Sequence, residues 1–240
     1  MNNKAFSLIE LSIVLIIIGL LVAGITGGQS LINNAKLKNV LTEIKEYEQA
    51  VNIFYSLKNR IPGDLNRDGR SGHNSGEEYK INDFEYPFDS ESSPNGIPNA
   101  ATGILAELFL EKIIDFKPAK AETNNLLQMV KNGSLPISNS FKKLFIYFEY
   151  RSPINYMKAY RDMPDNKTSL ALFNIEDQYN KENAKIFEFL DRKIDDGYSF
   201  YGNMRSTCGG KNVSNGNGPY IDNESDILNV CRNAFIILNL

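Results

Sequence analysis

The 240-residue sequence contains no tryptophan, one histidine and two cysteines. Because His73 is the only histidine, a metal site that needs two histidines from the same chain is excluded. His73 would also have to be the base of any Ser-His-Asp arrangement, and no nucleophile motif supports that role. Its neighbours are glycine, asparagine and serine, so we interpret His73 as an exposed loop residue.

Motifs for phosphate and nucleic-acid binding are also missing from the sequence. The segment TGGQS (Thr26–Ser30) does not have the spacing of a phosphate-binding loop. The formal net charge of −3 argues against nonspecific nucleic-acid binding as the main function. We therefore expect no catalytic residues, no bound organic cofactor and no nucleic-acid partner.

What the sequence does have is one long apolar run near its N-terminus. From Leu11 to Ile25 the only polar side chain is Ser12, and counted from Leu8 the run is about 18 residues. A helix of that length is about 27 Å long, close to the thickness of the hydrocarbon core of a bilayer. A secretory signal peptide, cut near Gly24, is one explanation.

Glu10 does not fit a signal peptide. A carboxylate in lipid costs about 2.5–3.5 kcal/mol, and charged residues in such segments are usually paired and functional. The stretch KAFSLIELSIVLIIIGLL (Lys4–Leu21) instead resembles the N-terminal signal of type IV pilins and of the pseudopilins of type II secretion. That family pattern is a short basic leader, a small residue that is usually Gly, a Phe, and a Glu four residues further on within an apolar helix.

The resemblance implies specific roles for three residues. Ala5, where Gly is usual, would be the last leader residue, and Phe6 would be the first mature residue. Prepilin peptidase would cut between them and methylate the new amino group of Phe6. In a filament, where the N-terminal helices bundle in an apolar interior, the Glu10 carboxylate would meet the Phe6 ammonium of a neighbouring subunit. Such a pair offsets part of the desolvation of both charges and would set the axial register between subunits.

The resemblance also implies a function and a location. It predicts a structural subunit, a minor pilin or pseudopilin, of a type IV pilus or type II secretion pseudopilus, and no enzyme. The partners would be prepilin peptidase, other pilin or pseudopilin subunits and the bacterial inner membrane, which the chain would cross once, with its globular domain in the periplasm. Charge alone favours the opposite orientation, because Lys36, Lys38 and Lys45 follow the apolar run and only Lys4 precedes it. We follow the signal because its motif is more specific.

The helix is expected to continue beyond the membrane. Between residues 37 and 54 apolar side chains recur at spacings of three and four, as on one face of a helix. The segment GITGG (Gly24–Gly28) separates the two halves and is either a flexible joint or a contact with a neighbouring helix. Pro62 predicts that the helix ends near Lys58.

The predicted domain organisation is a leader at residues 1–5, an N-terminal helix at 6–58 with its transmembrane part at 6–28, and an extracytoplasmic globular domain at 59–240. The fold class is α+β, with the amphipathic half of the helix packed on a small antiparallel sheet in a pilin-like fold that carries loop and helix insertions. Loops are predicted at 59–99, further helices at 100–116 and 183–197, and strands at 142–150, 169–175 and 233–240.

Cys208 and Cys231 are the only cysteines. In the oxidising compartment outside the inner membrane two cysteines most often pair, although two buried free thiols are the alternative. The closed loop would span about 24 residues and contribute about 3 kcal/mol in the chain-entropy model. The resemblance favours the pair, since many pilins close their C-terminal region with one disulfide.

Asp64, Asn66 and Asp68 alternate and are followed by a glycine, as at the start of a calcium-binding loop. Ser75 stands where an EF-hand has glutamate. A solvated turn is an alternative, because Asp, Asn and Gly favour turns without a metal. A real calcium site would point to a second function, a secreted or membrane-anchored calcium-dependent binding module with an ordinary signal peptide.

The segment KIDDG (Lys193–Gly197) places Asp195 and Asp196 at a predicted helix C-terminus. Carboxylates there oppose the helix dipole by about 0.3–1 kcal/mol, so a further partner is expected. One interpretation is a capped turn with both carboxylates in water. The other is that they bond buried backbone donors or a cation.

Overall fold

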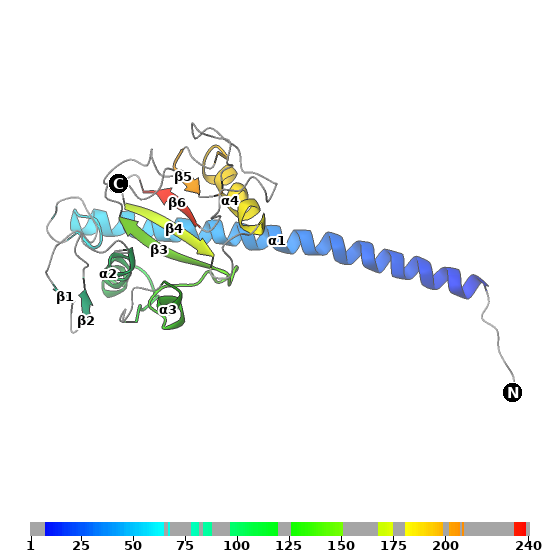
Figure 1. Cartoon of the computed structure of the whole chain (residues 1–240), viewed down its shortest axis with the longest axis horizontal. Helices are drawn as coiled ribbons and strands as arrows, with labels where there is room; N and C mark the ends of the chain where they lie inside the picture. The colour runs from blue at the N-terminus through cyan, green and yellow to red at the C-terminus, as the bar shows by residue number, and fades with distance from the viewer. Residues whose placement is uncertain are drawn as a thin grey trace.

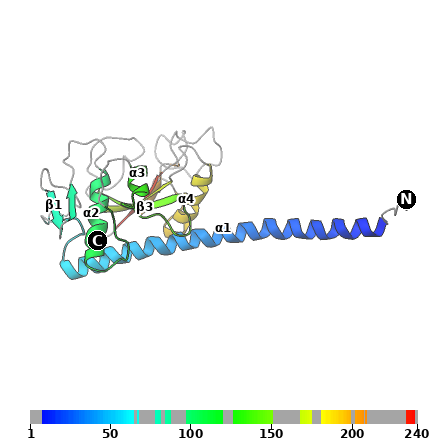
Figure 2. The ribbon, with the colours of Figure 1, turned by 90° about the horizontal axis from the view of Figure 1, so that it is seen from below.

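The computed structural model describes residues 8–64, 67, 78–81, 84–87, 97–119, 126–150, 168–174, 181–198, 202–206, 208 and 233–238. Its dominant feature is the helix α1 (Leu8–Lys58), which is 51 residues long. The first half of α1 projects away from the domain, and the second half lies along it (Figure 1 and Figure 2).

α1 is continuous through Gly24–Gly28, so the structure contains no break at the GITGG segment. The Thr26 hydroxyl bonds back to the carbonyl oxygens of Val22 and Ala23, at 3.1 and 3.0 Å. Apart from the neighbouring backbone of α1 itself, no atom of the described residues lies within 4 Å of where a Cβ would stand on these glycines, which leaves room for another helix to approach closely. The helix ends at Lys58, as predicted.

The packed half of α1 buries the predicted apolar stripe. Val40, Ile44, Val51 and Phe54 are each no more than 1% exposed. Tyr47 packs edge-on against the ring of Phe148 in the sheet, with 6.0 Å between ring centroids. Burial, together with two nearby glutamates, raises the pKa of Tyr47 to about 12. The spacing that predicted an amphipathic helix is therefore confirmed by which side chains face the domain.

The core of the domain is a four-stranded antiparallel sheet in the order β3-β4-β6-β5. The strands are β3 (Leu144–Tyr150), β4 (Thr168–Asn174), β5 (Met204–Ser206) and β6 (Asn233–Ile237). One face of this sheet packs on α1 (Figure 2). The predicted α+β arrangement, a long N-terminal helix on a small antiparallel sheet, is confirmed.

Two elements lie in the region predicted to be only loop. They are the hairpin strands β1 (Glu78–Ile81) and β2 (Phe84–Pro87), which pair with each other apart from the main sheet. Aromatic and branched residues on both sides of a two-residue Asn-Asp connection are the sequence signal for this hairpin. Nearby glycines and prolines obscure that signal.

The remaining helices are α2 (Ile97–Leu110), α3 (Leu126–Lys131) and α4 (Lys181–Ile194). The predicted extension of the second helix to residue 116 is wrong. Lys112 adopts a left-handed conformation with φ of 58°, and the Ile113 amide donates to the Leu108 carbonyl at 3.0 Å. This is a Schellman motif, in which glycine usually occupies the left-handed position. Because a lysine stands there instead, the sequence did not indicate that the helix ends here.

A buried ion pair fastens the end of α1 to α2. Arg60 donates to both oxygens of Glu107, at 2.6 and 2.8 Å, and the Gly63 amide donates to the same carboxylate at 2.7 Å. Glu107 is buried, and the Arg60 guanidinium lies 5.0 Å above the ring of Phe54. The chain that leaves α1 is therefore held against the core by a bidentate contact.

The variant Glu107→Gln tests this fastening. It removes the buried carboxylate charge that faces the Arg60 guanidinium, so we expect the free energy of unfolding to fall by about 3–5 kcal/mol. The matched control is Glu111→Gln, which removes the neighbouring exposed pair with Lys58 (2.6 Å) and should cost about 0–1 kcal/mol. Urea unfolding of the full chain in detergent, followed by circular dichroism, measures both. Equal losses in the two variants would show that the buried pair has no special role.

Candidate functional site

The exposed half of α1 is the feature that calls for a partner. Every large apolar side chain from Leu8 to Ile32 is exposed, including Leu8 at 86%, whereas Val40 is the first buried residue of the helix. By length and composition α1 could cross a membrane, although a signal sequence would pass the same test. A leucine or isoleucine that moves from water into an apolar medium gains about 1.5–3 kcal/mol. This half of the helix is thus suited to lipid or to a bundle of other helices.

Glu10 lies in the first turn of α1 and is exposed among these apolar side chains. The nearby Ser12 hydroxyl is satisfied within the helix, by the Ile9 carbonyl at 2.9 Å. Ala5 and Phe6, the predicted cleavage residues, lie outside the described residues.

A groove of about 400 Å³ runs between the packed half of α1, the end of α4 and strand β6. Its lining includes Lys45, Glu48 and Lys193 among aliphatic side chains. Burial raises the pKa of Glu48, and the Lys45 charge opposes that rise. Among the described lining residues there is no histidine or cysteine and no nucleophile next to a base, so this groove does not form a recognisable catalytic centre.

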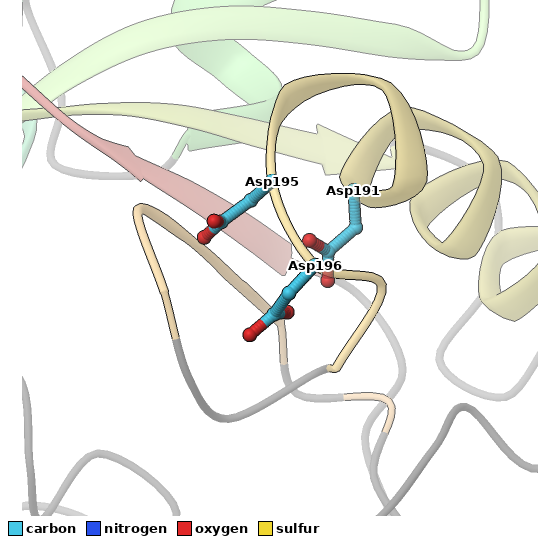
Figure 3. Close-up of side chains that lie close together, drawn as sticks. All are labelled: Asp191, Asp195 and Asp196. Atoms are coloured by element: carbon cyan, nitrogen blue, oxygen red, sulfur yellow. The ribbon is translucent and has the colours of Figure 1, made fainter.

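The aspartates at the end of α4 form a compact cluster (Figure 3). Asp191, Asp195 and Asp196 each place one oxygen within 4.8 Å of the others. Asp191 is buried, Asp195 is partly buried and Asp196 is exposed. A cation could use this spacing, but the oxygens also have protein partners.

Those partners are backbone amides. Asp195 accepts hydrogen bonds from the amides of Asn203 and Met204, the latter at 3.3 Å. Asp196 accepts from the Tyr198 amide at 2.8 Å. Asp196 is exposed and bonds within its own turn, which fits the interpretation of a capped turn. Asp195 bonds one exposed and one partly buried backbone donor and ties the end of α4 to the start of β5.

Gly202 is required by this contact. Its φ is +77°, and a Cβ at this position would overlap the Asp195 carboxylate. A side chain here would therefore meet both backbone strain and a steric clash. Sequence spacing could not reveal the contact, because residues seven positions apart have no fixed separation in space when they do not share a helix or strand.

Of the three predicted calcium ligands, the structure describes only Asp64. Asp64 is buried, its amide donates to the Ile61 carbonyl at 3.1 Å, and its own carbonyl accepts from Arg60 at 3.4 Å. Asn66 and Asp68 lie outside the described residues. Calcium binding by this loop therefore stays a prediction.

The predicted disulfide is described at one end. Cys208 is buried and disulfide-bonded. Cys231, the other cysteine of the sequence, lies outside the described residues, and so does His73. The pairing of Cys208 with Cys231 stays a prediction.

Comparison with known proteins identifies the N-terminus. Residues 1–26 match the family model of the prokaryotic N-terminal methylation motif. This motif is the prepilin signal of type IV pilins and pseudopilins, so the predicted resemblance is confirmed, and the chain has the signal of a prepilin peptidase substrate. No curated protein and no solved structure matches the chain. The long apolar helix that follows the signal fits a transmembrane anchor.

The contact between Gly202 and Asp195 is tested by Gly202→Ala. We expect a loss of more than about 1 kcal/mol in unfolding free energy, because strain and overlap act together. Gly133→Ala is the matched control, since Gly133 has the same φ of +77° but nothing within 4 Å of its Cβ position. Chemical denaturation in detergent measures both variants. If Gly133→Ala costs as much as Gly202→Ala, the clash with Asp195 contributes nothing.

Proposed function

We propose that the protein is a minor pilin or pseudopilin, a structural subunit that assembles through α1 into a type IV pilus or a type II secretion pseudopilus. One observation carries this proposal. The methylation motif runs directly into an exposed apolar half-helix, which is continuous with a half that is built into the domain core. A cleavable signal peptide needs no such continuity, because it is separated from the domain that it exports.

Processing follows from the position of the motif. Prepilin peptidase would cut between Ala5 and Phe6 and methylate the new amino group of Phe6. Ala5 is small, as a residue at this cleavage site has to be. The cut would remove the leader and keep the whole apolar half of α1 attached to the domain.

The membrane is the proposed location before assembly. The exposed half of α1 would cross the inner membrane once, and the domain would stand in the periplasm, where Cys208 could form its disulfide with Cys231. In the assembled filament the same helix half would leave lipid for a bundle of neighbouring helices. Both surroundings are apolar, so the transfer does not expose the helix to water.

Glu10 would act in that bundle. The N-terminal ammonium of Phe6 and the Glu10 carboxylate are each costly to place alone in an apolar medium. Pairing Glu10 of one subunit with Phe6 of the next offsets part of that cost, and it does so only at one axial offset between the helices. We therefore assign Glu10 a role in register between subunits.

A structural role also agrees with the contacts of two acidic residues, because Glu107 and Asp195 each bond to other parts of the domain. The buried Glu107 neutralises Arg60, and Asp195 holds the start of β5. The signal itself points to a structural subunit.

The variant Glu10→Gln in the native cell tests the proposed assembly. We expect normal membrane insertion and processing, because the change makes the helix more apolar, but a loss of about tenfold or more in the amount recovered in filaments, as expected for about 1.4 kcal/mol or more of lost pairing. The measurement is an immunoblot of sheared filaments against membrane fractions. Ser12→Ala is the control, since Ser12 bonds only within its own helix among the contacts described. Wild-type incorporation of Glu10→Gln would remove the register role.

A further inference from the structure

The far end of α1 carries a second exposed apolar surface, on the side of the helix that is turned away from the sheet. Ile53 is 49% exposed and Leu57 is 65% exposed. Ile53 projects about 200° from the buried Val51, and Leu57 follows Ile53 by four residues, so the two lie on nearly the same side of the helix. The sheet lies on the other side of α1 (Figure 2).

The helix around this pair carries no charge. None of the residues from Gln49 to Leu57 is charged, whereas the segment just before it, Glu43–Glu48, contains three glutamates and a lysine. The Asn52 side-chain amide donates to the Glu48 carbonyl at 3.0 Å, and the Ser56 hydroxyl donates to the Asn52 carbonyl at 2.9 Å. Both polar side chains therefore keep a partner within the helix if this surface enters an apolar contact.

Lipid is too far away to cover the pair. Ile53 lies about 31 Å beyond Ile32 along the helix. The polar layer outside the hydrocarbon core is about 5–8 Å thick on each side of a bilayer. When the apolar half of α1 spans the membrane, Ile53 and Leu57 therefore stand well outside the headgroups, so a partner for them would be a protein.

The pair is also too small to hold a partner by itself. Its two side chains expose on the order of 100 Å² of apolar surface. A stable interface between two proteins buries about 1,200–2,000 Å² in total. A contact at this place is therefore part of a larger one between the same two molecules. Within the described residues, the large exposed apolar surface is the first half of α1.

We propose that Ile53 and Leu57, together the distal patch, pack against the apolar half of α1 of a second copy of this chain. The proposal rests on the assembly through α1 proposed above. The two surfaces match in charge, because residues 11–35 contain no charged side chain either. The hydroxyls of Ser12 and Thr26 in that half also bond within their own helix. The two surfaces can therefore meet without burying a charge.

This contact fixes how far the two copies are displaced. Chains that insert through the same signal share one orientation, so their helices are parallel. The distal patch of one copy lies beside residues 11–35 of the other only when the helices are displaced by about 33–63 Å along their axis. Two copies that span the same bilayer stand level and cannot make this contact. It forms when one copy has moved outward relative to the other, as in a filament.

Photo-crosslinking in the native cell tests the contact. The photoreactive residue p-benzoylphenylalanine replaces Leu57, the cells are irradiated, and the cross-linked peptides from sheared filaments are identified by mass spectrometry. We expect a link from position 57 to residues 11–35, at a higher yield per chain in filaments than in membranes. Such a link joins two chains, because these positions are at least about 33 Å apart within one helix. The same residue in place of Tyr55, which is exposed and about 200° from Ile53, should not form it.

A double variant measures what the distal patch contributes. Ile53→Ser combined with Leu57→Ser should lower the amount recovered in sheared filaments by about tenfold, because two aliphatic side chains no longer leave water on assembly. Unfolding of the full chain in detergent should change little, since both side chains are exposed in the subunit. Tyr55→Ser is the matched control on the same helix and should keep wild-type recovery.

The other outcomes separate this proposal from the proposed function. A chain that is recovered in filaments without a link from position 57 to residues 11–35 would overturn the distal patch and leave assembly through α1 standing. A link to a different protein would overturn the second copy as the partner, and an equal yield in membranes would overturn the displacement. Absence of the wild-type chain from filaments would overturn the proposed function itself, and the distal patch with it.

Discussion

The structure depends on the continuity of α1, a single helix whose two halves have different surroundings. Its second half buries Val40, Ile44, Val51 and Phe54 in the domain core, whereas its first half presents only apolar side chains, Ser12 and Glu10 up to Ile25. Because the backbone hydrogen bonds of a helix are internal, the same element can pass from protein core to lipid without leaving polar groups unsatisfied. The helix that fits a membrane anchor is therefore also part of the domain core.

Contacts at both ends of the packed half join the domain to α1. At the end nearer the exposed half of α1, the Glu43 carboxylate accepts hydrogen bonds from the amides of Asn139 and Ser140. At the far end, Arg60 and Glu107 hold the outgoing chain against α2. A displacement of the helix would consequently move the helix and the sheet as one body, which the proposed transfer of the subunit from bilayer to filament requires.

Much of this could be predicted from local sequence patterns. The extent of α1, the main strands β3, β4 and β6, and the prepilin signal each follow from a spacing or a motif within one segment. The parts that were missed depend on backbone conformation or on contacts between neighbouring elements. The Schellman cap at Lys112 uses a residue that rarely takes a left-handed conformation, and the partners of Asp195 come from a strand after the helix.

The most direct test is mass spectrometry of the N-terminal peptide of the mature protein from its native cell. An N-methylated Phe6 is the predicted result, because it means that the cut precedes the apolar half and leaves α1 intact. A chain that begins near Gly24 would contradict the account, since the exposed half of the helix would then have been a signal peptide and would be lost. An intact Met1 would contradict processing and would mean that Ala5 prevents the cut.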